Sequence, residues 1–191
     1  MQLRQSIWMW AMPPWLELSN RGILARNLDK NVRGSIAIRT QSTDERWRLS
    51  KVEDTISLGK AIFLKRPLIK FLLLEGPLGA GKTTLVKGIA ASLGIEEPIT
   101  SPTFALSQHY LSGEKALIHL DLYRLENPDA ANELFLQEEE EAKGLGAIMV
   151  VEWPERLSLD LPVAWKLKLQ HYSNDQRIAH LMAPRLEDKN N

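Results

Sequence analysis

An apolar run, a glycine-rich turn and a helix-forming segment follow one another between residues 69 and 93, and this succession restricts the fold more than any other feature. Residues 69–74 are almost all apolar over the length of a strand, which is typical of a strand buried on both faces of a sheet. A helix is expected from Thr83 to about Leu93, ending at Gly94. The sequence therefore predicts an α/β fold in which a tight turn joins a central strand to a helix.

The turn has a composition suited to binding phosphate groups. Its glycines let successive backbone N–H groups point into one concavity, and the positive end of the next helix dipole adds to the attraction for anions. Lys82 would supply a charge for the β and γ phosphates, and the Thr83 hydroxyl would bind Mg²⁺. A turn with an incidental lysine is the alternative, but the pattern arises by chance in only roughly 1% of chains this long. We interpret it as a P-loop formed by Gly76, Pro77, Leu78, Gly79, Ala80, Gly81, Lys82 and Thr83.

Two carboxylates follow two further predicted strands. The apolar runs at residues 116–120 and 147–151 end in Asp121 and Glu152. Ligands collect at the carboxyl ends of parallel strands, and P-loop enzymes use an acid there to hold Mg²⁺ or to orient the attacking nucleophile. We expect both acids to be catalytic together with Lys82, rather than a cap or a surface charge. The sequence leaves open which of the two faces the metal.

The remaining elements complete one predicted domain. A capping box at Ser50–Glu53 should begin a helix, and a second helix is expected over residues 127–134. Residues 163–171 alternate between apolar and polar, which favours a half-exposed antiparallel strand, with a turn at 173–175 and a hairpin partner at 177–182. The expected fold is a single P-loop NTPase-like α/β domain. Its mixed, largely parallel central sheet is flanked by helices and carries a C-terminal antiparallel hairpin.

Composition divides the chain into three parts. Residues 47–185 form the expected ATPase domain and residues 186–191 a polar tail. Residues 1–46 hold three tryptophans within the first fifteen positions and then a polar stretch, and we expect this segment to be poorly ordered. Three interpretations of it stay open: an extension outside the domain, an organellar transit-like segment, or a wrongly assigned start codon.

The overall composition excludes several classes of function. The 24 basic and 24 acidic residues cancel, so the chain lacks the broad positive field of an autonomous nucleic-acid binder. The absence of cysteine excludes disulfides, thiolate zinc sites and thiol nucleophiles. No apolar run approaches the roughly 20 residues of a membrane span.

Other segments give weaker signals. Thr100–Phe104 lies where a switch loop would lie, and a switch and a simple turn remain equally open. Glu138–Glu141 is interpreted as a solvated helix face. No Asn-Lys-x-Asp motif for guanine is present, which favours ATP over GTP. The four histidines show no metal-ligand spacing and are interpreted as structural; they are His109, His119, His171 and His180.

Four motifs together resemble the TsaE family (formerly YjeE), P-loop ATPases of bacterial tRNA threonylcarbamoyladenosine biosynthesis. The motifs are Gly76–Thr84 (GPLGAGKTT), Ser101–Phe104 (SPTF), His119–Leu125 (HLDLYRL) and Val151–Glu155 (VEWPE), and the resemblance covers residues 47–184. It implies that Thr83 and Glu152 hold Mg²⁺ and that Asp121 is the other acid needed for hydrolysis. Further nucleotide contacts are implied at Thr55, Thr84, Trp153 and Arg177. Pro77 departs from the aspartate more common in the family, which puts affinity in doubt rather than activity.

The resemblance also implies partners and a location. Members act with the partners TsaB and TsaD, and TsaD transfers a threonylcarbamoyl group to the adenosine next to the anticodon. Contact with tRNA would therefore be indirect or made through partners. A cytoplasmic protein with no membrane contact is expected. Two alternative functions stay open: a P-loop small-molecule kinase, in which Asp121 and Arg124 would bind the acceptor, and a nucleotide-gated binding module, in which hydrolysis is incidental.

Overall fold

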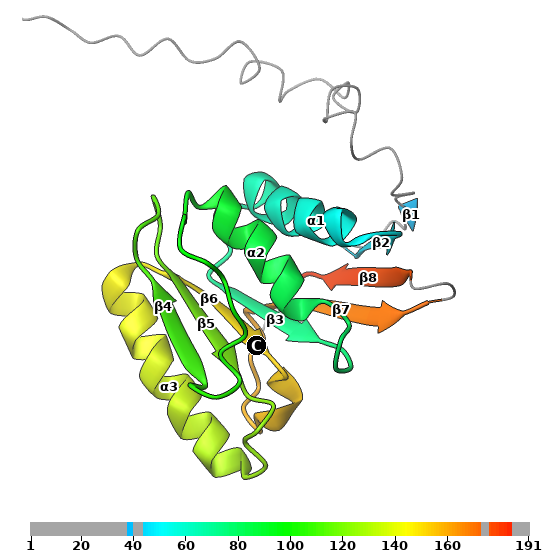
Figure 1. Cartoon of the computed structure of the whole chain (residues 1–191). Coiled ribbons are helices and arrows are strands. Elements are labelled where there is room, and N and C mark those ends of the chain that lie inside the picture. Colours follow the sequence, from blue (N-terminus) through cyan, green and yellow to red (C-terminus); the bar gives the residue numbers. More distant parts are fainter. Residues whose placement is uncertain (1–37, 40–43, 173–175, 185–191) are drawn as a thin grey trace, which may run out of the picture. The chain divides into compact units, whose positions relative to one another are not determined.

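Eight strands form one sheet in the computed structural model, which describes residues 38–39, 44–172 and 176–184 (Figure 1). The strand order is β1-β2-β8-β7-β3-β6-β5-β4. The central strands carry continuous apolar side chains, as the sequence predicted. The strands are β1 (Ile38–Arg39), β2 (Glu45–Leu49), β3 (Phe71–Glu75), β4 (Ser107–Tyr110), β5 (Leu117–Asp121), β6 (Ile148–Glu152), β7 (Trp165–His171) and β8 (Arg177–Met182).

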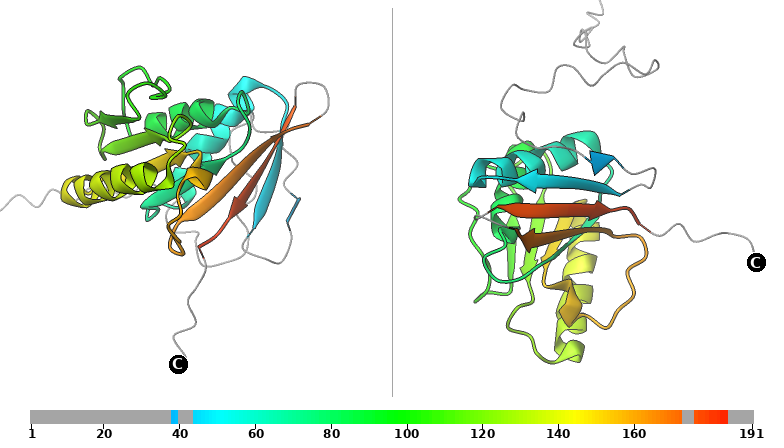
Figure 2. Two further views of the ribbon diagram at one scale, coloured as in Figure 1. Left: turned by 90° about the horizontal axis from the view of Figure 1, so that it is seen from below. Right: turned by 90° about the vertical axis from the view of Figure 1, so that its right-hand side faces the viewer.

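The sheet is mixed, which confirms the predicted fold class. Parallel pairing joins β3 to β6 and to β7, and β5 to β6, so the parallel part occupies the centre of the sheet. β7 and β8 form the predicted antiparallel hairpin, whose turn at residues 173–175 lies outside the described residues. The prediction for β7 was incomplete, because this strand is also parallel to β3. The polar residues that alternate with apolar ones along β7 stay exposed, because no described helix covers their face of the sheet (Figure 2).

Helices cover both faces of the central sheet. α1 (Val52–Lys65) and α2 (Lys82–Ser92) lie side by side on one face, and α3 (Pro128–Leu145) lies on the other (Figures 1 and 2). Successive side chains of a strand point to opposite faces of the sheet, so alternate strand residues pack in two separate hydrophobic cores. Leu72 and Leu74 of β3 pack with α1 and α2, whereas Leu73 packs in the core that contains Phe135 of α3. The residues of β5 and β6 that face α2 are therefore on the same side as the glycine-rich turn.

Helix starts and lengths differ in detail from the prediction. The first residue of α1 follows Lys51, and the Asp54 carboxylate accepts hydrogen bonds from the backbone N–H groups of Ser50 (2.8 Å) and Lys51 (3.2 Å). The acidic half of the cap is thus Asp54, and the prediction of Glu53 was wrong by one residue. α3 runs to Leu145, so it extends beyond the range 127–134 and includes the acidic run interpreted as a helix face, because buried residues continue to recur at helical spacing.

α1 and α2 approach each other closely through two glycines. A methyl group at Gly59 would overlap the carbonyl oxygen of Leu85, and one at Gly88 would overlap the carbonyl oxygen of Ile56. Backbone atoms cannot move aside as a flexible side chain can. The contact fixes the position of α2, and with it the position of the loop that precedes α2.

Gly88→Ala is therefore expected to lower the free energy of unfolding by about 1–3 kcal/mol, because the added methyl overpacks a backbone contact. Gly144→Ala is the matched control: Gly144 is also in a helix, and nothing lies within 4 Å of an added Cβ. That change should be neutral or stabilise the protein by up to about 1 kcal/mol. Chemical denaturation of both variants checks the prediction, and equal stability changes would contradict the close contact.

Strand β2 was not predicted and begins two residues before the expected start of the domain. It pairs antiparallel with β8, and β1 pairs with β2. Glu45 forms an ion pair with Arg66, and Asp44 bonds to His180 at 3.1 Å. Residues 1–37, 40–43 and 185–191 lie outside the described residues, so the expected character of the N-terminal segment and of the tail stays a prediction.

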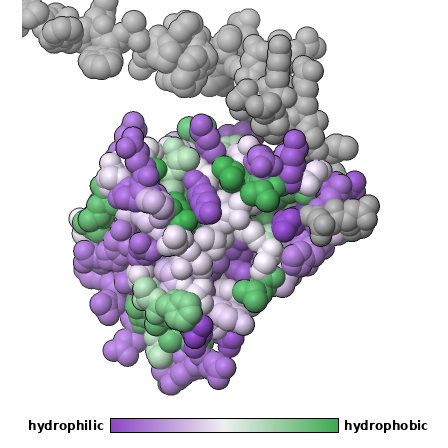
Figure 3. Space-filling model, viewed as in Figure 1, coloured by the Kyte–Doolittle hydropathy of each residue, from purple (hydrophilic) through white to green (hydrophobic). Residues whose placement is uncertain are grey.

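Apolar and polar residues are mixed along the helices of the described ranges. No helix there is long and apolar enough to cross a membrane. Apolar side chains on the face shown in Figure 3 form several separate groups among hydrophilic ones.

Candidate functional site: a glycine-rich loop with two strand-end carboxylates

The glycine-rich loop, residues 76–83, leads from the end of β3 into the first turn of α2. Gly76 has φ +142° and a methyl group there would overlap the carbonyl oxygen of Leu169, so this position accepts only glycine. Gly81 precedes α2 with φ +100°, a left-handed conformation that side chains rarely adopt. The first N–H groups of a helix have no partner within it. The loop therefore presents backbone donors and the positive helix end at the same place.

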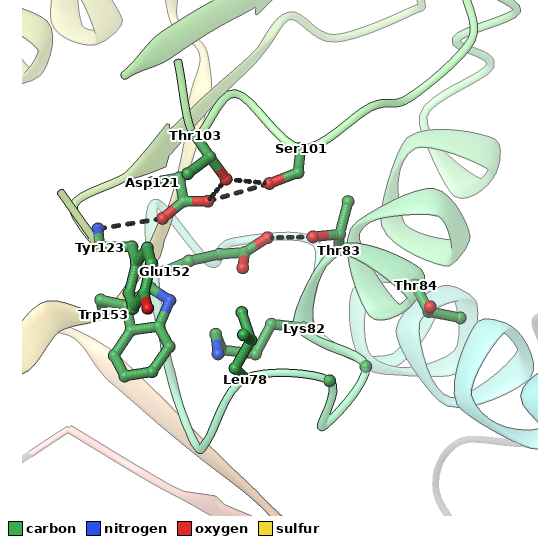
Figure 4. A pocket seen from close by; sticks show the side chains of 12 residues that line it. Leu78, Lys82, Thr83, Thr84, Ser101, Thr103, Asp121, Tyr123, Glu152 and Trp153 are labelled. Atoms are coloured by element: carbon green, nitrogen blue, oxygen red, sulfur yellow. Dashed lines mark hydrogen bonds between the residues drawn. The ribbon is translucent and has the colours of Figure 1, made fainter. Parts of the chain in front are cut away.

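Lys82 lines the pocket beside this loop, together with Thr83, Glu152 and Trp153 (Figure 4). The residue is 4% exposed, and its Nζ donates to the carbonyl oxygens of Gly76 (2.7 Å) and Pro77 (3.2 Å). The same Nζ lies 4.0 Å from the centre of the Trp153 ring. Burial lowers the pKa of Lys82, and the nearby carboxylates of Glu152, Glu155 and Asp121 oppose that shift. The site thus keeps a cation out of water, where an anion would interact with it strongly.

Thr83 and Glu152 are joined directly. The Thr83 hydroxyl donates to Oε1 of Glu152 at 2.8 Å, and Glu152 is 3% exposed at the end of β6 (Figure 4). A hydroxyl and a carboxylate oxygen are the hard ligands that Mg²⁺ prefers. The described residues contain no group of three or more His, Cys, Asp or Glu that could hold a metal ion. The Thr83 hydroxyl and the Glu152 carboxylate still fit Mg²⁺, because this ion usually takes one or two protein ligands and completes its shell with water and phosphates.

Asp121 is held by three donors beside Glu152. The two acids face each other in register across β5 and β6. Oδ2 of Asp121 accepts from the hydroxyls of Ser101 (2.9 Å) and Thr103 (2.5 Å), and Oδ1 accepts from the backbone N–H of Tyr123 (3.0 Å). The segment Thr100–Phe104 is therefore anchored to the site rather than being a distant turn. Whether it acts as a switch stays a prediction.

Aromatic rings close one side of the pocket. Trp153 follows Glu152 with φ +61°, a left-handed conformation that costs a non-glycine residue roughly 1–3 kcal/mol. Its ring lies 4.9 Å, centre to centre, from that of Tyr123. The strained backbone turns the indole toward Lys82 and the pocket (Figure 4).

A family model matches this chain over most of the domain that holds the site. The model describes the threonylcarbamoyl adenosine biosynthesis protein TsaE and matches residues 49–180. The chain belongs to the TsaE family. This result confirms the resemblance found in the sequence, and it places the protein in tRNA threonylcarbamoyladenosine biosynthesis.

Individual TsaE proteins and one solved structure support the assignment. TsaE from Nostoc sp. (strain PCC 7120) is 43% identical over 112 residues, which are 57% of this chain and 67% of that protein. TsaE from Bacillus subtilis (strain 168) is 40% identical over 119 residues, which are 61% of this chain and 71% of that protein. The crystal structure of Bacillus subtilis YdiB superposes with a TM-score of 0.56 at 27% identity, covering 76% of this chain and 89% of that one.

Most of the site residues predicted from the sequence and the TsaE resemblance meet at one pocket. Asp121, Glu152, Lys82, Thr83 and Trp153 all line it. So do four residues of the loop and α2: Leu78, Gly79, Gly81 and Thr84. Gly76, Pro77 and Ala80 belong to the loop but not to the lining. Nucleotide contact by each of these residues remains a prediction.

Thr55 and Arg177 lie beside the loop near Gly81 and do not line the pocket. Thr55 is 2% exposed within α1, and a methyl group at Gly81 would meet both Thr55 and Arg177 at 3.7 Å. Arg177 also donates to the carbonyl oxygen of Gly79 at 3.5 Å. Arg177 thus contacts the loop, and Thr55 lies next to it. Their predicted contact with the nucleotide is not tested by this geometry.

The sequence did not predict the contacts of two buried polar residues. His119 was interpreted as structural, and Nε2 of this fully buried side chain lies 2.9 Å from Oε1 of Glu152. A signal was present, since His119 stands two residues before Asp121 and so faces the same side of β5. Glu138 was assigned to a solvated helix face, yet it is 7% exposed and bonds to Nε2 of His109 at 2.6 Å. The rest of that acidic run is exposed or half-buried.

Proposed function

We propose that this protein is a Mg²⁺-dependent ATPase that acts with the TsaB–TsaD complex and supports threonylcarbamoyl transfer to the adenosine next to the anticodon of tRNA. One observation carries the proposal: Lys82, the Thr83–Glu152 pair and the donor-held Asp121 all line a single pocket. Each of these three groups would perform a different task in nucleotide hydrolysis. The family assignment supplies the biological context.

ATP would bind through the loop and Lys82. The glycine-rich backbone and the start of α2 offer N–H donors to phosphate oxygens. Lys82 now donates to two backbone carbonyls, and the charge of the phosphates would replace these contacts and offset the burial of the ammonium group. The Trp153 and Tyr123 rings would border the bound phosphates. Binding therefore uses a cation already positioned in the protein.

Hydrolysis would use the two acids differently. Thr83 and Glu152, which already share a hydrogen bond, would hold Mg²⁺. The bound ion would neutralise charge on the phosphates. Asp121 does not contact Thr83 in the structure; its carboxylate is fixed by Ser101, Thr103 and the N–H of Tyr123. We assign Asp121 to orienting the attacking water and accepting its proton, because a rigid carboxylate favours one geometry.

A small-molecule kinase is the competing enzymatic function. It would need Arg124 to steady a phosphate, but the guanidinium carbon of Arg124 lies 4.2 Å from the centre of the Phe104 ring, and Arg124 does not line the pocket. Product analysis separates the two functions. ADP with free phosphate supports the ATPase, whereas a phosphorylated acceptor with no free phosphate would refute it.

Trp153 is expected to report nucleotide binding through its fluorescence. Its ring is 4.0 Å from Nζ of Lys82, so a phosphate that binds Lys82 would change the indole's surroundings. Adding ATP should shift the emission, over a background from the other five tryptophans. Trp153→Phe should still bind ATP in a calorimetric titration but lose most of the signal. An unchanged signal in that variant would show that Trp153 lies away from the nucleotide.

A further inference from the structure

One oxygen of Glu152 accepts two hydrogen bonds from two different elements. Oε1 accepts from the Thr83 hydroxyl at 2.8 Å and lies 2.9 Å from Nε2 of His119. A carboxylate oxygen can only accept, so Nε2 of His119 is the donor. In Figure 4 the other carboxylate oxygen of Glu152 points toward the part of the pocket where Lys82 lies.

His119 is placed where an apolar residue would pack more simply. The side chain is fully buried on β5, and its neighbours on the strand, Ile118 and Leu120, are also fully buried. Its Nδ1 is buried without a hydrogen-bond partner in the described part of the chain. An unsatisfied buried nitrogen destabilises a fold. The contact with Glu152 is the one feature of His119 that an apolar side chain would not reproduce.

The two donors to Oε1 differ in what ligand binding does to them. Thr83 lies at the start of α2, and its hydroxyl would turn from Glu152 to a metal ion when one binds. His119 is on a central strand behind Glu152, away from the pocket lining, so its bond need not break. Metal-ligand carboxylates are commonly held by such an outer hydrogen bond, which fixes their orientation.

We propose that His119 is a positioning residue. Its Nε2–H holds the Glu152 carboxylate in the orientation that would receive Mg²⁺ once the Thr83 hydroxyl no longer donates to it. The proposal rests on the proposed function, in which Glu152 is the metal-side acid. It assigns no direct contact between His119 and the nucleotide.

Three variants of the full chain test this role. His119→Gln places an amide N–H near the position of Nε2, His119→Asn places one near Nδ1 and too far from Glu152, and His119→Leu offers none. The Mg²⁺ concentration for half-maximal hydrolysis should rise about 10–100-fold in the Asn and Leu variants. The Gln variant should stay within about threefold of wild type. The KM for ATP, measured at saturating Mg²⁺, should change little in all three.

A second readout does not depend on hydrolysis. The rise in unfolding temperature that ATP causes, measured over a range of Mg²⁺ concentrations, should show the same order of variants. Ile118→Val is the control, because it trims the buried core on the opposite face of β5 and should leave the Mg²⁺ dependence unchanged. It also shows how much a small loss of core stability alone contributes.

The outcomes separate this proposal from the proposed function. Suppose that wild type hydrolyses ATP and that the Gln and Leu variants have the same Mg²⁺ dependence as each other, whether normal or impaired. The positioning role of Nε2 is then overturned, whereas the proposed ATPase function is not. If Mg²⁺ and ATP neither stabilise wild type nor are turned over, the proposed function fails and the role of His119 fails with it. Rescue by Gln but not by Asn supports the proposal.

Discussion

Glu152→Gln and Asp121→Asn are each expected to reduce ATP hydrolysis about 10²–10⁴-fold, the usual cost of losing a positioned acid or base. ATP should still bind within a few-fold of wild type, because neither carboxylate belongs to the glycine-rich loop or contacts its backbone donors. Removing a negative charge near the phosphates can even strengthen binding. Steady-state hydrolysis and calorimetric ATP titration of the same preparations measure the two effects separately.

Raising the Mg²⁺ concentration distinguishes the roles of the two acids. Glu152 contacts Thr83, so Glu152→Gln should regain part of its activity when metal is in excess. Asp121 contacts Ser101 and Thr103 instead, and Asp121→Asn should stay inactive. Rescue of Asp121→Asn alone would exchange the two assignments. Full activity in both variants would remove the carboxylates from the mechanism.

Lys82→Ala is expected to weaken ATP binding by at least about 10²-fold, since charge-assisted hydrogen bonds contribute roughly 1.5–3 kcal/mol each. The fold should persist, because the hydrogen bonds that the ammonium group donates to described residues go to the loop carbonyls of Gly76 and Pro77. Lys87→Ala is the matched control on the exposed side of the same helix and should bind ATP normally. Equal affinities in the two variants would contradict the phosphate-loop assignment.

The centre of the site could be predicted because its elements carry strong local signals. The apolar runs that became β3, β5 and β6 were placed within about two residues, and each ends at the loop or at a predicted acid. A strand buried on both faces has little freedom in its sequence. The register of Asp121 opposite Glu152 then follows from two parallel strands that end at the same edge.

The edges of the sheet were harder to predict because less of them is buried. β4 has the sequence Ser-Gln-His-Tyr, in which only Tyr110 is buried. β2 contributes one fully buried side chain, Leu49, and lies across the expected domain boundary. The alternating pattern of β7 indicates which face of the strand is covered. It cannot indicate that β3 lies beside it and runs parallel to it.

Buried polar residues were missed for a different reason. His119 and Glu138 are buried through contacts with residues more than twenty positions away along the chain, Glu152 and His109 respectively. Local composition cannot show such a partner. For the same reason, the Ser101-Pro102-Thr103-Phe104 motif does not show that Ser101 and Thr103 contact Asp121.

We propose that ATP hydrolysis at this pocket supports modification of tRNA. A reconstituted synthesis of threonylcarbamoyladenosine that contains tRNA, TsaB, TsaD and the remaining components, and lacks only this protein, tests this role most directly. Adding the wild-type chain with Mg²⁺ and ATP should restore the modified nucleoside over many turnovers, and Glu152→Gln should not. Failure of the wild type to restore it, or full restoration by a hydrolysis-dead variant that binds ATP, would contradict the account.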